Sequence, residues 1–219
     1  MKTAGEERLF NNGPLIDAIL NQDDARTMSL VEEAVANGVR PEEIISSGLQ
    51  PAMVIVGEKF TSGEFFVPDM LLAGRSVSRA LAVLEPRLSQ SDLTTLGRVV
   101  IGTVFGDVHD IGKNLVTIML KGTGFDVVDL GINVPAAKFV EAVKQYKPDI
   151  LALSALVTTT MVAMGDVIKA LSAAGLRSQV KVIVGGAPVT RQFAEKIGAD
   201  EFGADSGVAM KVCRNLVGK

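Results

Sequence analysis

The segment RVVIGTVFGDVHDIGKNLVTIML, residues 98–120, contains the pattern from which the rest of the chain is interpreted. Its first part, RVVIGTVFG, is apolar and rich in β-branched residues, which predicts a buried strand, and the LVTIML at its end predicts a helix. The stretch GDVHDIGKN joins the two. Because open α/β sheets bind ligands at the carboxyl ends of their strands, this turn is a candidate ligand site.

The turn contains His109, the only histidine of the chain, with Asp107 two residues before it and Gly112 three residues after it. A metal-binding imidazole commonly donates its second ring nitrogen to a carboxylate, which fixes the tautomer and raises the basicity of the ligand. The D-x-H-x-x-G turn is consistent with such a ligand, and Gly112 would allow close approach. An isolated D-x-H is more often a loop histidine beside an aspartate that caps a helix.

From Arg98 onward, apolar strand-like runs alternate with helical patterns. Five strands that are each followed by a helix predict a doubly wound parallel sheet with right-handed crossovers. We expect a flavodoxin-like (Rossmann-type) order 2-1-3-4-5, which places the switch point between the first and third strands. The predicted strand segments are residues 98–106, 125–131, 148–156, 180–188 and 199–204.

The ends of three predicted strands carry the candidate site. The third strand ends in ALSALVTTT, whose Ser154 and Thr158 to Thr160 have hydroxyl groups that can donate and accept. Any one of them is more often a helix cap, but together they lie opposite His109. The fourth strand ends in Gly185-Gly186, which permits a turn or leaves room for a ligand against the backbone. No G-x-G-x-x-G follows the first strand, which disfavours a standard dinucleotide site.

The N-terminal half has apolar residues three and four apart, with short Gly, Pro and Asn junctions. This pattern predicts a small antiparallel four-helix bundle. Its helices are expected within residues 14–20, 23–38, 41–60 and 67–88. We therefore divide the chain into a helical domain at 1–88, a polar linker at 89–97 and a sheet domain at 98–219.

Composition excludes several classes of protein. The chain has 219 residues, 47% of them hydrophobic, and a net charge of −3 without a Lys/Arg run, which argues against nucleic acid as a partner. The N-terminus lacks the apolar core of a signal peptide, and no stretch approaches the length of a membrane span, so we expect a cytoplasmic protein. With one His and one Cys, Cys213, any metal would arrive within a cofactor.

Three short motifs of the second half resemble the signature of a known family. The B12-binding domains of corrinoid proteins carry D-x-H-x-x-G, then S-x-L, then G-G. The matching positions are Asp107, His109 and Gly112, then Ser154 and Leu156, then Gly185 and Gly186. Residues 56–86 are similar to the helical cap that precedes this domain in methionine synthase and in the corrinoid proteins of methanol, methylamine and methoxyaromatic methyltransferase systems.

The resemblance implies roles for the matched positions. His109 would replace the dimethylbenzimidazole of the cofactor as the lower ligand of cobalt, which is the base-off/His-on form. Asp107 and Thr160 would complete a ligand relay with it. A slot would take the displaced nucleotide tail, and its lining would be Ser154, Leu156, Gly185 and Gly186. Thr158 would contact the corrin edge, and further cofactor contacts would come from Gly106, Val108, Asp110, Ile111 and Gly112.

The resemblance also implies that the helical bundle is a lid over the methyl face of the cofactor, with Phe66 nearest cobalt and Met70 and Leu71 beside it. Phe66 could equally be ordinary bundle core. In this interpretation the linker, Ser89 to Gly97, acts as a hinge when a partner docks.

The function implied is that of a corrinoid subunit that carries a methyl group on cobalt and does not turn over substrate alone. The cofactor would be cobalamin or a related corrinoid, cycling between methylcob(III)alamin and cob(I)alamin. The partners would be a substrate:corrinoid methyltransferase, a corrinoid:tetrahydrofolate or coenzyme M methyltransferase and a reductive activator, with no membrane partner. The alternatives are a subunit of an adenosylcobalamin-dependent mutase, a B12-dependent sensor, and a flavodoxin-like domain without B12.

Overall fold

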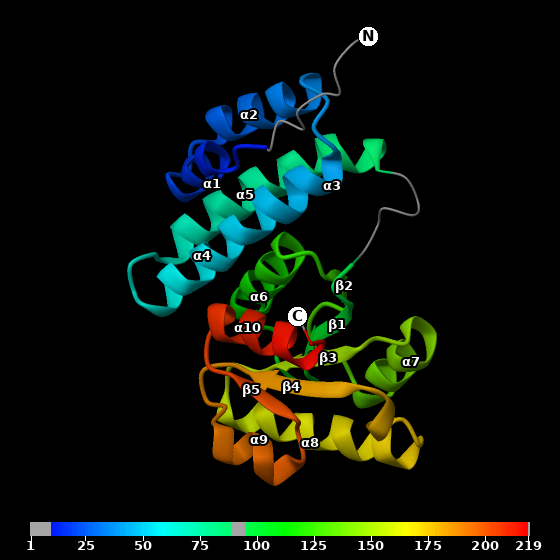
Figure 1. Cartoon of the computed structure of the whole chain (residues 1–219). Helices are drawn as coiled ribbons and strands as arrows, with labels where there is room; N and C mark the ends of the chain where they lie inside the picture. The colour runs from blue at the N-terminus through cyan, green and yellow to red at the C-terminus, as the bar shows by residue number, and fades with distance from the viewer. Residues whose placement is uncertain (1–9, 89–94, 219) are drawn as a thin grey trace.

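The computed structural model describes residues 10–88 and 95–218. Its helical N-terminal half stacks on one side of a parallel sheet, with helices α6 and α10 between the two (Figure 1). The first five helices are α1 (Gly13–Leu20), α2 (Asp24–Ala36), α3 (Pro41–Ile44), α4 (Gln50–Thr61) and α5 (Val67–Leu84). The remaining helices are α6 (Ile111–Gly122), α7 (Ala136–Tyr146), α8 (Thr158–Ala173), α9 (Arg191–Ile197) and α10 (Ser206–Leu216). Single turns are η1 (Ile45–Leu49), η2 (Glu85–Arg87) and η3 (Arg177–Gln179).

The predicted third helix is continuous but contains a π-helical turn, η1, between α3 and α4. Pro51 lies at the start of α4 and has no N–H, so it cannot donate to the carbonyl group of Ser47 four residues earlier. That carbonyl oxygen instead accepts a hydrogen bond of 2.7 Å from Asn12 Nδ2, just before α1. The wider turn thus follows from a proline inside the helix, and the free carbonyl group ties α1 to the third helical segment.

The sheet confirms the predicted topology. It is parallel throughout, with the order β2-β1-β3-β4-β5. Its strands are β1 (Arg98–Thr103), β2 (Asp126–Asp129), β3 (Ile150–Ser154), β4 (Lys181–Gly185) and β5 (Glu201–Gly203). The register aligns Thr103 with Ser154 and Ser154 with Gly185, so the strand ends carrying the three motifs lie next to one another.

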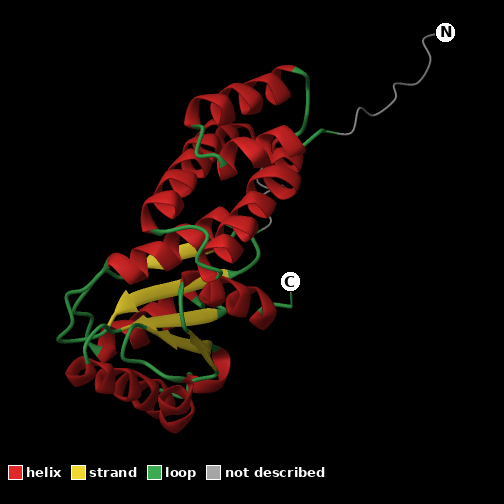
Figure 2. Cartoon of the chain, turned by 90° about the vertical axis from the view of Figure 1, so that its left-hand side faces the viewer, coloured by secondary structure: helices red, strands yellow, loops and turns green. Residues whose placement is uncertain are grey.

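Alternate residues of each strand face two different cores, because side chains along a strand point to opposite faces. Val99 and Ile101 join the cluster formed by the N-terminal helices, α6 and α10. Val100 joins the cluster formed with α7, α8 and α9. The helices therefore cover both faces of the sheet, as seen edge-on in Figure 2. The first cluster runs without interruption from Leu15 of α1 to Cys213 of α10.

The helical half packs closely on α10 and α6. Gly57 of α4 and Gly207 of α10 allow the helices to meet backbone to backbone, since a Cβ atom on Gly207 would clash with the Gly57 carbonyl oxygen. Gly74 of α5 lies against the side chain of Ile118 of α6, with which a Cβ atom at position 74 would clash. The two halves thus share one apolar core. The proposed domain limits remain a prediction, and residues 89–94 of the predicted linker and 1–9 of the helical domain lie outside the described residues.

None of the helices within residues 10–88 and 95–218 is both long enough and apolar enough to span a membrane.

Candidate functional site

The candidate site begins with a tight turn at the carboxyl end of β1. The Asp107 N–H donates to the Val104 carbonyl oxygen at 3.1 Å, and Gly106 at the third turn position has φ +83°. A turn of this kind needs a residue that tolerates positive φ at that position, which explains the glycine. The turn directs the Asp107 side chain into the interior, where its carboxylate is fully buried.

Every polar group of Asp107 is hydrogen-bonded. Besides the turn contact, its carbonyl oxygen accepts from the Asn133 N–H at 2.9 Å. Its carboxylate oxygen Oδ1 accepts from both the backbone N–H of His109, at 3.0 Å, and the ring atom Nδ1, at 2.7 Å. The other oxygen, Oδ2, accepts from the Leu156 N–H at 2.8 Å and from Thr160 Oγ1 at 2.6 Å. Four hydrogen bonds from three residues, His109, Leu156 and Thr160, thus converge on one carboxylate.

These contacts keep Asp107 ionised. Burial alone would raise the pKa of this carboxyl group, because it penalises the charged form. The hydrogen bonds from Thr160, the Leu156 backbone and His109 outweigh this effect and hold the pKa well below its usual range. An ionised acceptor favours the tautomer of His109 in which Nδ1 carries the proton.

The carbonyl oxygen and ring atom Nδ1 of His109 are fixed by hydrogen bonds, whereas the side chain remains partly exposed. Buried Thr103 donates from Oγ1 to the His109 carbonyl oxygen at 3.0 Å, and Asp107 holds Nδ1. The side chain remains 49% exposed. The second ring nitrogen, Nε2, makes no hydrogen bond with the described part of the chain and can therefore bind a metal. No group of three or more His, Cys, Asp or Glu side chains within the described ranges could hold an ion by itself.

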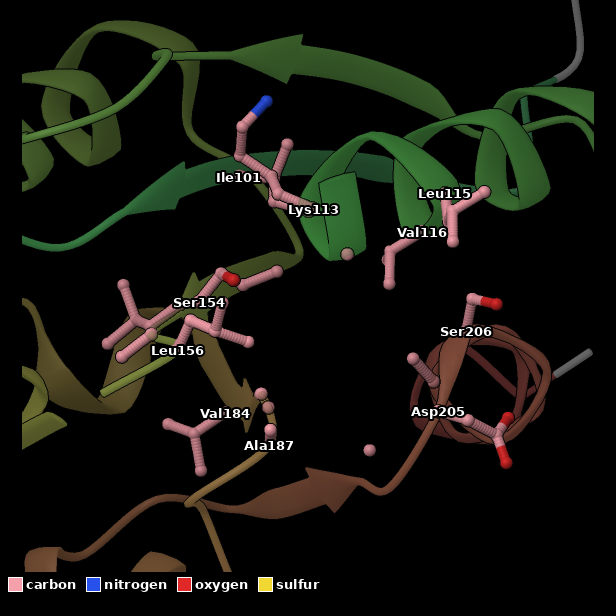
Figure 3. A pocket seen from close by; sticks show the side chains of 18 of the residues that line it. Ile101, Lys113, Leu115, Val116, Ser154, Leu156, Val184, Ala187, Asp205 and Ser206 are labelled. Carbon is pink, nitrogen blue, oxygen red and sulfur yellow. The ribbon is translucent and has the colours of Figure 1, made fainter. Parts of the chain in front are cut away.

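A cavity of about 620 Å³ opens beside His109, between the ends of the strands and the helices α6 and α10. Its wall is mostly apolar, with Ser154 and Leu156 on one side and Asp205 and Ser206 opposite (Figure 3). Predicted site residues that line it are Val108, His109, Asp110, Ile111, Gly112, Ser154, Leu156, Gly185 and Gly186. The structure thus brings the three sequence motifs together around one space.

The Gly185-Gly186 pair forms a thin part of the cavity wall. A Cβ atom on Gly185 would lie 2.8 Å from the Gly203 carbonyl oxygen, and one on Gly186, which has φ +126°, would overlap the carbonyl oxygen of Ala155. Side chains are excluded at both positions by the backbone of the neighbouring strands. The glycines are therefore required by the packing of the backbone itself, and the cavity wall carries no side chain at these two positions.

Other predicted residues lie outside this cavity. Gly106 and Thr158 are exposed, and Thr160 donates to Asp107 without lining the cavity. Phe66, which begins α5, and Leu71 are exposed by 66% and 45%. Met70 is fully buried, and its sulfur accepts from Ser206 Oγ at 3.6 Å. Met70 therefore lies in the contact between α5 and α10, not at the surface.

Sequence analysis missed several residues of the site. Thr103 and Asn133 carry no motif that marks them. The Thr103 hydroxyl contacts the turn directly after its own strand, whereas the Asn133 contacts form only when β1 and the segment after β2 come together. Lys113 follows the motif directly; it is 3% exposed and pairs with Asp129. Cys213, which no sequence motif marks, is buried in the cavity wall, and burial raises the pKa of its thiol to about 12.

Comparison with known proteins identifies the family. Sequence profiles described as B12 binding domain match residues 14–85 and 97–211. Trimethylamine corrinoid protein 1 of Methanosarcina acetivorans is 47% identical over 189 residues, which are 85% of this chain and 88% of that protein.

Two solved structures agree. A cobalamin-binding protein from Desulfitobacterium hafniense superposes with a TM-score of 0.83 at 35% identity, over 95% of this chain and 100% of that one. A chain of the methanol:cobalamin methyltransferase complex MtaBC from Methanosarcina barkeri gives a TM-score of 0.83 at 28% identity, over 100% of this chain and 87% of that one. The family profiles, the relative and the shared fold together establish that this chain belongs to the B12-binding corrinoid proteins, whose cofactor is cobalamin or a related corrinoid.

Proposed function

We propose that this chain is the corrinoid subunit of a methyltransferase system and carries a methyl group from a substrate-specific methyltransferase to a second methyltransferase. The single observation that carries the proposal is the geometry of His109. Its Nδ1 is bonded to a buried, ionised Asp107, and its half-exposed ring leaves Nε2 free to bind cobalt from below. When bound, the corrinoid supplies the cobalt atom that accepts and releases the methyl group.

The described residues fit such a cofactor. In the proposed base-off/His-on form, His109 takes the place of dimethylbenzimidazole, and Asp107 and Thr160 hold its ring in position. The cavity would take the displaced nucleotide tail, because its wall is mostly apolar and carries no side chain at Gly185 and Gly186. Ser154 supplies a hydroxyl group to the buried base.

The exposed rim suits the macrocycle. Large apolar side chains surround His109 on both sides of the turn: Val108 is 63% exposed and Ile111 is 70% exposed. They would cover the lower face of the corrin ring, and Thr158 would contact its edge. On the opposite side, exposed Phe66 and Leu71 at the start of α5 would shield the methyl group as a lid.

The relatives favour a methylated amine as the source of the methyl group. Trimethylamine corrinoid protein 1 matches most of this chain at higher identity than the MtaBC chain does. We therefore propose a methylamine:corrinoid methyltransferase as the first partner. The proposed second partner is a methyltransferase that uses coenzyme M or tetrahydrofolate, and a reductive activator would restore any oxidised cofactor.

The lower ligand is tested by electron spin resonance of the full-length protein loaded with cob(II)alamin. We expect nitrogen superhyperfine splitting that changes when histidine is labelled with ¹⁵N. His109→Ala should lose the splitting while still retaining some corrinoid through the cavity. A wild-type spectrum that does not respond to the label would mean that the benzimidazole remains bound, and the proposed role of His109 would be wrong.

The carrier role is tested separately. The reduced, loaded protein is mixed with methanol, monomethylamine, dimethylamine or trimethylamine, each with and without its methyltransferase. We expect methylation only when a methylamine and its methyltransferase are both present. Methylation only by the methanol enzyme would overturn the assigned donor, and methylation without any enzyme would overturn the carrier role.

A further inference from the structure

Asn133 has an unusual backbone conformation that no helix end explains. It has φ +54°, one of three described residues other than glycine with positive φ. The other two, Gln22 and Lys147, lie just after α1 and α7, where left-handed residues commonly terminate helices. Asn133 lies instead between β2 and α7. A strained conformation away from a helix end calls for a local reason.

The reason lies in two hydrogen bonds to the turn that carries Asp107. The Asn133 N–H donates to the Asp107 carbonyl oxygen at 2.9 Å. The side-chain atom Oδ1 of Asn133 accepts from the Gly106 N–H at 2.8 Å. One residue thus holds both ends of the Gly106–Asp107 segment, and the left-handed conformation turns its two polar groups to the same side.

The segment that contains Asn133 is itself fixed by hydrogen bonds to β1. On either side of Asn133, the Gly131 carbonyl oxygen accepts from the Thr103 N–H at 2.9 Å, and the Val134 N–H donates to the Thr103 carbonyl oxygen at 2.9 Å. The segment is therefore an extension of the β1 ladder. Asp129 accepts from the Gly131 N–H at 2.8 Å and pairs with buried Lys113, which anchors the start of the segment to α6.

The Gly106 turn needs these two hydrogen bonds with Asn133 to stay in one conformation. Glycine has more conformational freedom than any other residue, and both Gly106 and its neighbour Phe105 are exposed. Rotation of the backbone at Gly106 would move Asp107. His109 would move with it, because its backbone N–H and its ring atom Nδ1 are both bonded to Asp107 Oδ1. The Asp107 carboxylate is bonded on the far side to Leu156 and Thr160, so the turn must stay fixed for all four contacts to persist.

We propose that Asn133 is a positioning residue for His109: its side chain fixes the Gly106–Asp107 turn and so keeps the imidazole ring aimed at the metal. The inference rests on the proposed function, because it assumes that His109 is the lower ligand. Asn133 itself touches neither the ring nor the cavity. Its effect is on how often the ring is in position to bind.

The test uses full-length protein loaded with cob(II)alamin. Asn133→Gly removes the Oδ1 acceptor but tolerates φ +54°, and it keeps the backbone N–H. Asn133→Asp retains an acceptor. Lys147→Gly is the matched control, since it removes a side chain at an exposed position with positive φ far from the turn. His109→Ala shows the midpoint potential of the protein without an imidazole ligand.

The Co(II)/Co(I) midpoint potential is the main readout. Co(II) keeps a lower ligand that Co(I) releases, so weaker ligation raises the midpoint. Loss of one hydrogen bond should weaken ligation about five-fold. For a one-electron couple this corresponds to a rise of about 40 mV in Asn133→Gly. Asn133→Asp and Lys147→Gly should show no rise. Without cofactor, the Gly106 amide proton of Asn133→Gly should exchange with solvent faster than in wild type.

The outcomes separate the two proposals. An unchanged midpoint in Asn133→Gly, in a protein whose wild type shows imidazole splitting, would overturn the role of Asn133 and leave the role of His109 intact. An equal rise of the midpoint potential in Lys147→Gly would also overturn the role of Asn133. The rise would then follow from any substitution by glycine at a position with positive φ. A wild type without imidazole splitting would overturn the proposed lower ligand, and the positioning role would fall with it.

Discussion

Thr160 Oγ1 lies 2.6 Å from Asp107 Oδ2, although the two residues are 53 positions apart in the sequence. Thr160 is in the first turn of α8, and the same hydroxyl oxygen lies 3.0 Å from the Val157 carbonyl oxygen. The single hydroxyl proton is thus shared between the Val157 carbonyl oxygen and the buried carboxylate. Thr160 does not cap the helix, because Val157 is the N-cap of α8 and no side chain accepts a capping hydrogen bond there.

Thr160→Val should destabilise the protein, because it keeps the shape of the side chain but removes a donor to an ionised, buried group. We expect a loss of about 1.5–3 kcal/mol in the free energy of unfolding, the range for hydrogen bonds to charged groups. Urea denaturation measures the change. Thr160→Ser should restore most of the loss, and Thr159→Val, at an exposed neighbouring position, is the control.

Asp107 should make stability depend on acid pH. Its folded pKa lies below its unfolded pKa, so its ionised form stabilises the fold at pH values above the unfolded value. This contribution is lost as the pH falls below the ordinary value of 3.8 toward the folded pKa. The difference in unfolding free energy between wild type and Asp107→Asn should therefore be large at pH 7 and smaller at about pH 2.5. A difference that stays constant with pH would contradict the lowered pKa.

Met70 and Leu71 should respond oppositely to truncation. Met70 is fully buried against α10, so Met70→Ala should cost about 2–5 kcal/mol of unfolding free energy. Leu71 is 45% exposed, so Leu71→Ala should change stability by less than about 0.5 kcal/mol. Urea denaturation of the protein without cofactor gives both values. Equal effects would mean that α5 is rotated relative to the packing described above.

Phe66 should influence the upper face of the cofactor only. If α5 begins above the methyl group, Phe66→Ala should speed photolytic loss of methyl from the methylated protein, because the ring no longer favours recombination. Lower-face ligation, measured by electron spin resonance, should stay the same. Equal photolysis rates in wild type and variant would exclude Phe66 from the lid.

A point substitution tests the lid better than removal of the helical half. Leu15 of α1 and Cys213 of α10 belong to one apolar cluster, and Gly57 meets Gly207 directly. Truncation before Ser89 would expose that cluster and disrupt the sheet half along with the lid. The helical half is thus both a cover for one face of the sheet and a candidate lid.

The sequence alone was sufficient for the architecture and for the centre of the site. Alternating apolar strands and helices predicted the order 2-1-3-4-5, because each β-α-β crossover is right-handed and local in the chain. That order predicts that the strand ends carrying the three motifs are adjacent, and the register confirms it by aligning Thr103, Ser154 and Gly185. The π-helical turn was not predicted, although Pro51 within the helical pattern was a visible signal for it.

Only the tertiary structure decided which residues support that centre. Asn133 holds the turn through two hydrogen bonds from a segment that is distant in the chain, and Thr103 holds it through one hydrogen bond to the His109 carbonyl oxygen. Nothing in the local sequence distinguishes these two residues from other loop and strand residues. The burial of Met70 also depends on where α5 meets α10, which helical periodicity cannot specify. Periodicity fixes which face of an element is apolar, whereas the partner of that face and the direction of each polar group are set by packing across the whole fold.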